Sequence, residues 1–479
     1  MTQPTAEEHA PPGEEPTELK RVMGPKLLLL FIVGDILGTG VYALTGQVAA
    51  EVGGAAWAPF IVAFLIALIT AFSYLELVTK YPQAAGAALY THKAFGVHFL
   101  TFIVCFTVMC SGITSASTAA RAVGSNLLAG FGIEASSTWT VVAVALVFMA
   151  LVAAVNLRGV GESVKANIVL TLVELSGLLF IILVGVFAAF GGKADFSRVM
   201  VFESPGDKSA FLAVTAATAL AFFAMVGFED AVNMAEETHD PVKNFPRMMI
   251  AGIGITGVIY VLVAIFTVAI VPVGELGASD TPLTLVVERA LPGFPIGSIF
   301  PFITIFAVAN SALINMLMAS RLLYGMAKQR VLPPFLGRVS PRRQTPTAAI
   351  VFTTVIALGL IVLVTLQEEN GVIAALGGTT SLLLLAVFTI VNVAVLKLRS
   401  NIVDRKHFVA PTILPILGAL LCAFFVGPWT GRDPLQYQIA GWLLLIGVVL
   451  WFVTWAFNRP ESTRITDPDA LSEREGGTN

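Results

Sequence analysis

Three carboxylic acids stand inside the most apolar stretches of this 479-residue chain. Asp35 lies in the segment VGDILGTGVY, Glu229 lies in LAFFAMVGFEDAVNMAEE, and Glu174 lies in a run that is otherwise uncharged. An ionised carboxylate is expensive in an apolar interior, and burial favours the neutral form, which suits a group that carries a proton. We therefore expect ion-coupling chemistry at Glu174 and Glu229. For Glu174 the alternatives are a structural hydrogen bond from a permanently protonated side chain and coordination of sodium.

Glycines interrupt two of these acidic segments. Gly34, Gly38 and Gly40 weaken a helix in the first segment, and Gly227 does so five apolar runs later. Unpaired backbone in hydrocarbon is tolerated only where it lines a protein or water cavity. A helix beginning after Gly38 would offer N–H groups to an anion, and one ending before Gly227 would offer carbonyls to a cation, so a small zwitterion fits both. Close helix packing through small residues is the alternative.

Composition indicates which elements must position these groups. Hydrophobic residues make up 56% of the chain and charged residues 12%, with a mean hydropathy of +0.85, whereas a soluble domain carries about twice that charged fraction. Twelve apolar runs are long enough to cross a bilayer. They lie near residues 27–50, 55–79, 97–120, 139–157, 167–191, 210–234, 247–271, 296–320, 347–366, 372–397, 409–429 and 437–457. We expect an all-α membrane protein with twelve transmembrane helices.

The basic residues indicate how these helices are oriented. With the N-terminus inside, 22 of the 28 Lys and Arg residues fall on the cytoplasmic side. The six on the opposite side are Arg121, Lys193, Arg198, Lys208, Arg289 and Arg432. This asymmetry predicts a multi-pass protein of the cell membrane with both termini cytoplasmic. The polar stretch 1–23 is expected to be a disordered tail without signal-peptide features, and 458–479 a second cytoplasmic tail.

Several function classes find no support in the residues. Cys105, Cys110 and Cys422 all fall in apolar runs and form neither a disulfide framework nor a metal-ligand cluster. No phosphate-binding GxxxxGKS/T motif and no nucleophile–base pair is visible, so neither a nucleotide-driven pump nor an enzyme is expected. We expect no cofactor, no metal and no nucleic-acid partner. A channel would need a continuous polar lining, whereas the polar groups cluster at two breaks.

Segments along most of the chain resemble a known family. GDILGTGVYALTG and FFAMVGFEDAVNMAEETHDPVKNFPR resemble the first- and sixth-helix signatures of amino acid–polyamine–organocation (APC) superfamily permeases. SYLELVTKYPQAAGAALYTHKAFG and SRLLYGMAKQRVLP resemble two further segments, and GESVKANIVLTLVELSGLLF is most similar to the cationic amino acid transporter branch. The resemblance implies a LeuT-type five-plus-five inverted repeat over 24–400 with helices 1 and 6 broken, two further helices within 401–457, and secondary active transport by alternating access.

The resemblance also implies roles for particular residues. The substrate carboxylate would meet the backbone N–H groups of Gly38, Thr39 and Gly40. The substrate α-ammonium would meet the carbonyls of Ile36, Phe223, Ala224 and Val226. Phe223 would be an aromatic gate that closes over the substrate from outside, with ordinary helix packing as the alternative. Asp35 would border the pocket, where relatives often carry a small or amide residue.

Coupling and substrate class follow from departures from the family pattern. Glu174 stands where proton-coupled relatives carry a Lys, and Ala309 and Asn310 stand where sodium-coupled relatives carry hydroxyls. A proton-coupled permease for cationic or neutral amino acids is therefore expected. A polyamine/amino acid exchanger, a sodium-coupled symporter and a transporter-like nutrient sensor are the alternatives. Unpaired acids such as Asp35 and Asp230 predict that acidic amino acids are excluded.

Three more glutamates match family positions near the cytoplasmic ends of the second and sixth runs. They are Glu76, Glu236 and Glu237. We expect them to pair with basic residues of the inner loops, such as Lys80 or Arg247, and to latch an inner gate.

Overall fold

The computed structural model describes residues 23–457 except 84–85, 134–137, 159–162, 205, 207, 236–237, 294–295, 329–331, 341–344, 368–370 and 404–405. The predicted tails and the predicted latch residues Glu236 and Glu237 lie outside this part of the chain. Throughout the described ranges the regular structure is helical, and backbone pairing of the β type is confined to two isolated bridges.

The chain forms sixteen α-helices over the described residues, with short 3-10 turns between some of them. The α-helices are α1 Pro25–Ile36, α2 Thr39–Val52, α3 Trp57–Lys80, α4 Gly86–Phe95, α5 His98–Gly130, α6 Thr138–Arg158, α7 Ser163–Phe190, α8 Ala210–Ala221, α9 Pro241–Ile270, α10 Val273–Gly277, α11 Pro282–Ala290, α12 Ile296–Lys328, α13 Thr347–Gln367, α14 Val372–Leu398, α15 Ile413–Val426 and α16 Pro434–Phe457. The 3-10 turns used below are η3 Phe222–Met225, η4 Ala231–Met234 and η6 Pro428–Thr430.

The apolar runs form helices because backbone polar groups in hydrocarbon must be paired within their own segment. Within the described residues, ten helices are long and apolar enough to cross a membrane. Two further apolar helices, Ala210–Met225 and Ile413–Val426, are shorter. Each of these twelve segments overlaps one predicted run, although the run predicted over 210–234 is helical only to Met225 before its break and the run predicted over 409–429 only over Ile413–Val426. The first long segment contains both α1 and α2. The sequence did not predict α4, α10 and α11 as separate helices, because they are too short to give an apolar signal.

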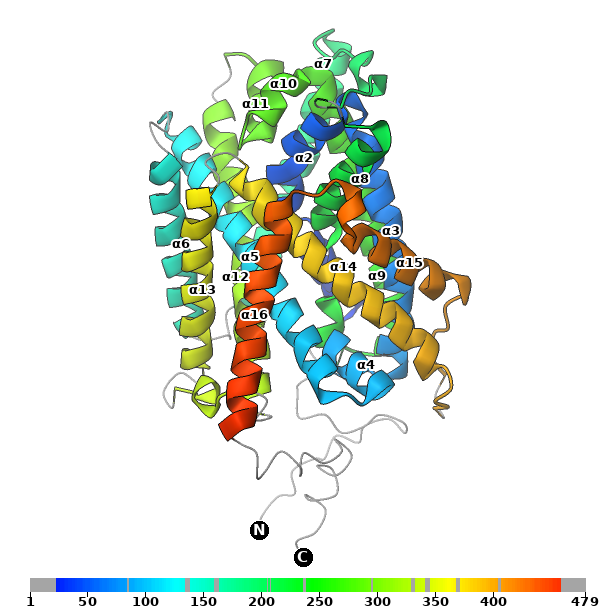
Figure 1. Ribbon diagram of the computed structural model, residues 1–479. Helices are drawn as coiled ribbons and strands as arrows, with labels where there is room; N and C mark the ends of the chain where they lie inside the picture. The colour runs from blue at the N-terminus through cyan, green and yellow to red at the C-terminus, as the bar shows by residue number, and fades with distance from the viewer. Residues whose placement is uncertain are drawn as a thin grey trace, which may run out of the picture.

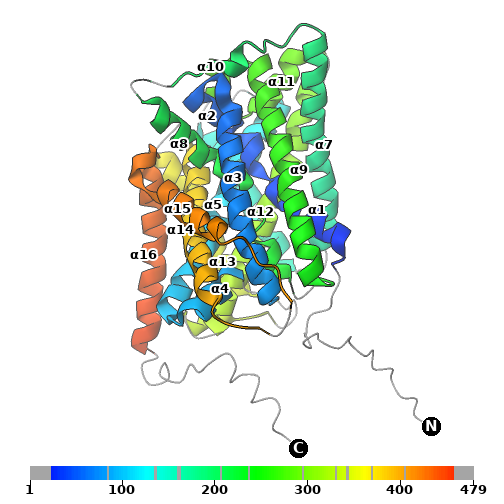
Figure 2. The ribbon, with the colours of Figure 1, turned by 90° about the vertical axis from the view of Figure 1, so that its right-hand side faces the viewer.

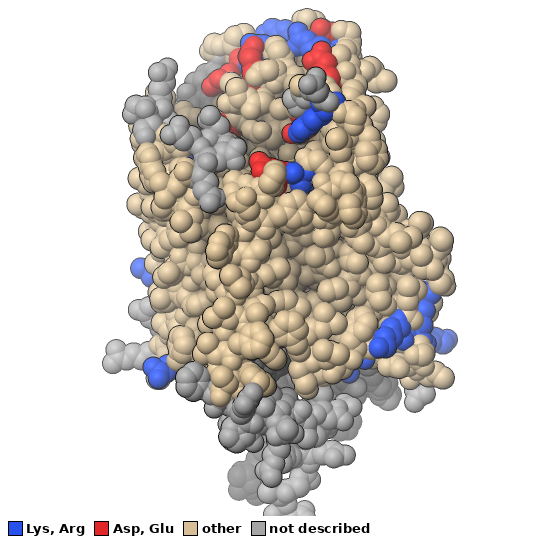
Figure 3. Space-filling view, in the orientation of Figure 1, with Lys and Arg blue, Asp and Glu red and all other residues tan. Residues whose placement is uncertain are grey.

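The long helices pack side by side in a bundle, with α4 at one end and α10 and α11 at the other (Figures 1 and 2). We call these the α4 end and the α10–α11 end. On the visible face, charged side chains lie towards these two ends, and a broad band without them lies between (Figure 3). Such a band is what a bilayer-facing surface requires.

The two interrupted segments lie inside the bundle. The helix pair α1–α2 packs against α7, α8 and α9, while α5 packs along α12 and α14 on the other side of the breaks. The bundle therefore surrounds both breaks with helices that come from distant parts of the sequence.

Glu76 pairs with a basic residue, as predicted, although this residue is Arg399 and not one of the two named examples, Lys80 and Arg247. The Glu76 carboxylate accepts hydrogen bonds from the Arg399 guanidinium at 2.8 and 2.7 Å and from the Ala410 N–H at 2.9 Å. Lys80 instead donates to the Leu398 carbonyl at 2.6 Å. Because Glu76 is only 2% exposed, its charge needs the bidentate partner that a guanidinium supplies. The contact joins α3 to the end of α14 and to the segment before α15.

Candidate functional site

The first break separates α1 from α2 at Leu37 and Gly38. Gly38 precedes the first residue of α2 and has no side chain, and no other side chain caps this helix end. The first N–H groups of an α-helix have no partner within the helix, so this end can bind an anion. On the other side of the break, the Ile36 carbonyl accepts a hydrogen bond of 2.5 Å from the Tyr260 hydroxyl. The carbonyl predicted to bind an ammonium group is therefore already held by α9 through one of its two lone pairs.

The second break follows η3 and is closed by its own acidic residue. Val226 is extended, and Gly227 has φ 121°, a conformation that glycine adopts readily and other residues rarely do. The Gly227 N–H donates to the Glu229 carboxylate at 2.8 Å, and the Asp230 N–H donates to the Gly227 carbonyl at 3.0 Å. Glu229 thus satisfies a buried N–H group that the interrupted helix leaves unpaired.

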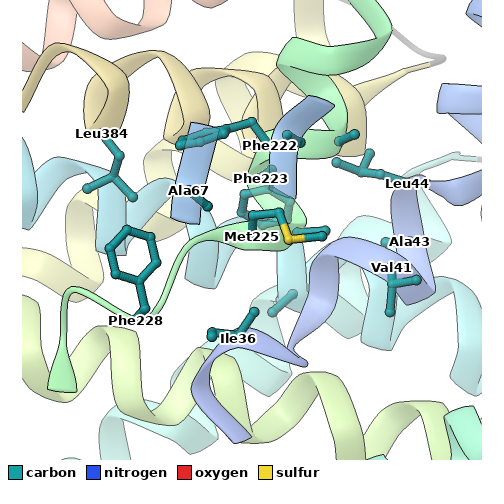
Figure 4. Packing of buried hydrophobic residues seen from close by; sticks show 14 of the residues in the cluster. Ile36, Val41, Ala43, Leu44, Ala67, Phe222, Phe223, Met225, Phe228 and Leu384 are labelled. Carbon is teal, nitrogen blue, oxygen red and sulfur yellow. The ribbon is translucent and has the colours of Figure 1, made fainter. Parts of the chain in front are cut away.

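The two breaks lie against each other. A Cβ placed on Gly227 would lie 2.7 Å from the Asp35 carbonyl oxygen, and one placed on Gly40 would lie 2.7 Å from the Cβ of Ala224. Figure 4 shows side chains from both sides, including Ile36 and Leu44 from the first interrupted segment, within one buried apolar cluster. Glycine at these positions allows two backbones to approach more closely than side chains permit.

A cavity opens beside both breaks and extends towards the α4 end along α5 and α12. It is lined by Asp35, Ile36, Gly38, Thr39, Gly40, Val108, Ser111, Gly112, Ser115, Phe223, Val226, Gly227, Glu229, Asp230, Ser311, Asn315, Met318, Ala319, Leu322, Thr380 and Leu384. It leaves about 40 Å³ for the centres of water-sized molecules, where a single water needs roughly 10–15 Å³. The space suits a small ligand.

Most of the predicted binding residues line this cavity, but two predicted site residues do not. Ala224 is absent from the lining, since its backbone packs against Gly40. Glu174 is also absent from the lining, because it lies on α7, which packs against α1. The cavity and the predicted proton carrier are therefore separate places in the protein.

Three polar groups of the cavity wall have no hydrogen-bond partner. They are one carboxylate oxygen of Asp35 and the hydroxyls of Thr39 and Ser311, all withdrawn from the protein surface. Buried polar atoms without partners are uncommon in native proteins, and a ligand or water that fills the cavity would satisfy them. Among the described residues that line the cavity there are three carboxylates and no Lys or Arg. This wall favours a ligand that is cationic or rich in hydrogen-bond donors.

The wall opposite the breaks contains residues that sequence reasoning missed. Ser111 and Ser115 come from α5, Ser311 and Asn315 from α12, and Thr380 from α14. Each of the first two pairs is spaced four residues apart, as small polar groups on one helix face must be. That spacing was the available signal. Ser311 also places a hydroxyl against Gly38, next to the positions where Ala309 and Asn310 were expected to leave none.

Glu174 is held on the far side of the first break. Its side chain is fully buried, and neither carboxylate oxygen has a hydrogen-bond partner. Its backbone carbonyl accepts a hydrogen bond of 2.8 Å from the Tyr42 hydroxyl of α2. One turn earlier on the same helix, Thr171 packs against Gly34 of α1. Glu174 is therefore an unpaired acid on a helix that touches the segments on both sides of the first break.

Phe223 lies in η3 and is 4% exposed. A Cβ placed on Gly377 of α14 would lie 3.2 Å from the Phe223 ring and 2.9 Å from the Leu44 side chain. The ring thus fills the space between the second break, α14 and α2, where it borders the cavity. A side chain in this place can close the cavity on the α10–α11 side.

Comparison with known proteins identifies the family. A family model described as amino acid permease matches residues 25–454. The chain belongs to this amino acid permease family. The match includes both breaks, the cavity and all twelve apolar segments, so the APC superfamily membership predicted from the motifs is confirmed. The chain is accordingly a multi-pass membrane protein.

Relatives of this permease carry different names. It is 28% identical to the methylthioribose transporter of Bacillus subtilis over 456 residues, which span 91% of this chain and 93% of the relative. It is 26% identical to the branched-chain amino acid permease BcaP of the same organism over 455 residues, again spanning 91% and 93%. It is 28% identical to the vacuolar cationic amino acid transporter 4 of Arabidopsis thaliana, over 82% of this chain and 65% of the relative. These identities support transport by an amino acid permease and select no single substrate.

Proposed function

We propose that this permease transports cationic or neutral amino acids across the cell membrane by alternating access. The observation that carries the proposal is the uncapped first turn of α2, which opens on a cavity lined by acids and hydroxyls. In this proposal the N–H groups of Gly38, Thr39 and Gly40 bind the substrate carboxylate. Carbonyls near the second break, at Phe223 and Val226, accept from the α-ammonium group.

The proposal includes an arrangement of the membrane segments. The ten segments within residues 24–400 would form a LeuT-type five-plus-five inverted repeat, with α15 and α16 added as a hairpin. Support comes from the positions of the two interrupted segments, which are the first of the twelve apolar segments and the sixth. Both termini would be cytoplasmic, which places the α4 end inside and the α10–α11 end outside, in keeping with the distribution of Lys and Arg.

A proton gradient is the proposed driving force, with Glu174 as the carrier. Its unpaired, fully buried carboxylate belongs to α7, which packs against α1 and holds Tyr42 of α2, and it does not line the cavity. Protonation there would alter the packing of α7 against α1 and α2, and so couple proton binding to the geometry of the substrate site. Sodium coupling is the competing mechanism, because Ser311 offers a hydroxyl beside Gly38.

A second substrate class has a specific observation in its favour. The acids and hydroxyls of the cavity wall accept hydrogen bonds from a polyhydroxylated neutral ligand as well as from an ammonium group. Met318, Leu322 and Leu384 add an apolar surface to the same wall. A methylthioribose-like compound combines both chemistries, and a relative that covers most of this chain bears that name.

Uptake by purified protein in proteoliposomes tests the proposal. Labelled lysine, leucine and methylthioribose are supplied in separate assays with an inside-alkaline pH gradient, with or without sodium, and unlabelled arginine, putrescine and glutamate are added as competitors. We expect gradient-driven uptake without sodium, competition by cationic amino acids and none by glutamate. Strong competition by glutamate would contradict the acidic pocket, and uptake of methylthioribose alone would replace the amino acid assignment.

A further inference from the structure

Arg432 is a buried cation outside the substrate site. It lies between η6 and α16 and is 6% exposed. Its guanidinium donates four hydrogen bonds. Nε donates to the Phe425 carbonyl at 2.9 Å, one terminal nitrogen donates to the Gly378 carbonyl and to Gln436 Oε1 at 3.0 and 3.1 Å, and the other donates to the Ser381 hydroxyl at 3.0 Å. A single side chain thus joins α15, α14 and α16.

Only neutral oxygens surround this guanidinium. In the described part of the chain no carboxylate lies within 4.0 Å of it. Burial lowers the pKa of Arg432 to about 10, so the side chain remains charged at neutral pH. A buried charge without a counterion is retained only where its hydrogen bonds are nearly complete. The geometry of the acceptors around Arg432 is therefore tightly constrained.

The turn of α14 to which Arg432 donates its hydrogen bonds also faces Phe223, the predicted gate. Gly378 and Ser381 are its acceptors on this helix. Gly377, the residue before Gly378, faces the Phe223 ring and Leu44, which leave no room for a side chain there. A shift of this turn of α14 would alter the surface against which Phe223 packs.

The residues just before Arg432 contact α8, the helix that leads into Phe223. The Thr430 carbonyl lies 3.0 Å from the Thr215 hydroxyl of α8, which also has the Phe211 and Leu212 carbonyls of its own helix within reach at 2.9 and 3.1 Å, and Thr430 is fully buried. A Cβ placed on Gly431 would lie 3.1 Å from the Leu212 carbonyl of the same helix. Figures 1 and 2 both show the orange segment between α15 and α16 beside α8. Because α8 continues directly into η3, this helix carries Phe223.

We propose that residues Thr430–Arg432 form a gate clamp that holds α8 and α14 together and keeps Phe223 in its closed position. Arg432 is a positioning residue in this clamp, since it acts through α14 and does not line the cavity. The C-terminal hairpin thereby sets how often the α10–α11 side opens. The inference rests on the proposed role of Phe223 as a gate, and it assigns a function to a hairpin outside the ten-segment core.

A cysteine reporter tests the clamp. Leu44 is 1% exposed and borders Gly377, so Leu44→Cys reacts with a membrane-impermeant methanethiosulfonate reagent only when this side opens. Adding Arg432→Gln should raise the labelling rate from the α10–α11 side about tenfold, because a neutral amide cannot replace the charged hydrogen bonds that the guanidinium donates to α14. Arg432→Lys should restore part of the parental rate, because a charged donor remains. Protein without the reporter corrects for Cys105, Cys110 and Cys422, which are buried.

A second, milder variant keeps the test decisive if Arg432→Gln does not fold. Thr215→Val removes, at constant shape, the hydroxyl that the Thr430 carbonyl shares with two carbonyls of α8, and it should raise labelling by about threefold. Thr365→Val is its matched control, because the buried Thr365 hydroxyl bonds only within α13, to the Ile361 carbonyl at 2.7 Å. This control should leave labelling unchanged.

The outcomes separate the clamp from a structural role and from the proposed function. Unchanged labelling in folded Arg432→Gln or Thr215→Val, with unfolding midpoints recorded in parallel, would overturn the clamp. Increased labelling in Thr365→Val as well would also overturn it, since general loosening would then explain the effect. Failure of every amino acid to shift the unfolding midpoint of the parent protein would contradict the proposed function, while the labelling result would still test the clamp.

Discussion

The two breaks expose different chemistry although both interrupt a helix at a glycine. At the first break no side chain caps the start of α2, and polar groups of Asp35 and Thr39 nearby have no partner. At the second break the Gly227 N–H is already bonded to Glu229. The first break is therefore open to a ligand, whereas the second supplies its own acidic cap.

Because of this difference, the two breaks favour ligand groups of opposite charge. An uncapped helix start favours an anionic group, while a break that contains Glu229 and Asp230 favours a cationic one. A zwitterion placed between them matches both. The comparison also shows that one glycine can create a binding surface while another creates a rigid turn, depending on whether a neighbouring side chain reaches the unpaired backbone.

The largest expected effect is at the first break. Gly38→Leu should reduce substrate affinity by at least about 100-fold, or roughly 3 kcal/mol, because its Cβ would overlap the Ser311 hydroxyl, so the new side chain displaces Ser311 and fills the cavity beside the unpaired N–H groups. Thermal-shift titration with the transported amino acid measures this loss. Gly254→Leu on α9 is the control, since a Cβ there meets no atom within 4 Å. Near-parental affinity in Gly38→Leu would refute the binding of the substrate carboxylate by the N–H groups of Gly38, Thr39 and Gly40.

Gly40 is a less suitable position for this test. A Cβ there would overlap Ala224 of the second break, so Gly40→Leu should lower the free energy of unfolding as well as the affinity. Comparing the two variants separates the open face of the first break from the face that packs against the second.

A second prediction tests whether coupling acts through the first break. Glu174→Gln should reduce accumulation driven by an inside-alkaline gradient about tenfold while sparing exchange, because an amide cannot take up a proton on the acidic side and release it on the alkaline side. Proteoliposome uptake and counterflow measure the two activities. Glu51→Gln is the matched control, as this residue forms an exposed pair with Lys208 at 2.8 Å. Unchanged accumulation in Glu174→Gln would move the carrier role to Glu229 or Asp35.

At the second break, stability should depend on the cap and not on its charge. Glu229→Ala should lower the free energy of unfolding by about 1–3 kcal/mol, because the buried Gly227 N–H loses its acceptor. Glu229→Gln keeps an acceptor oxygen and should lose much less. Denaturant or thermal unfolding of both variants tests this contrast. Equal losses would show that the carboxylate charge, and not the hydrogen bond, stabilises the break.

The smallest expected effect concerns selectivity at Asp35. Asp35→Asn should weaken competition by lysine and putrescine relative to leucine by roughly three- to tenfold, because a carboxylate in a weakly screened site attracts cations. Asp195→Asn, in an exposed loop, provides the matched control. A preference for leucine that is the same before and after Asp35→Asn would indicate that the side chain is neutral in the parent protein.

The sequence predicted the helical segments well because its signals are local. Twelve apolar runs, two glycine-rich interruptions and isolated acids can each be recognised within about twenty residues. The cavity lining around Asp35, Gly38 and Phe223 followed from the same signals together with the family motifs. Ser311 and Asn315 escaped notice because small polar residues are common on packed membrane helices, and only their shared face marks them.

Contacts between distant segments could not be predicted in this way. The partner of Glu76 is 323 residues away. The expectation that a buried carboxylate pairs with a Lys or Arg is met equally well by nearer basic residues such as Lys80. Likewise, the separation of Glu174 from the cavity depends on how α7 packs against α1, which no local pattern specifies. Residue type predicted which groups need partners, while tertiary packing decided which partners they obtain.

The gate clamp also has a consequence for biosynthesis. Arg432 follows Phe223 by about two hundred residues, which a ribosome takes roughly 10 to 40 s to add. Because α14 is complete only at Leu398, both helices that hold the gate are made, and the residues that fasten them together are not, during the last part of that interval, roughly 2 to 7 s. Closure of the pathway on the α10–α11 side is thus among the last events of assembly. A chain released before Arg432 would contain every residue that lines the cavity but would lack the clamp on that side.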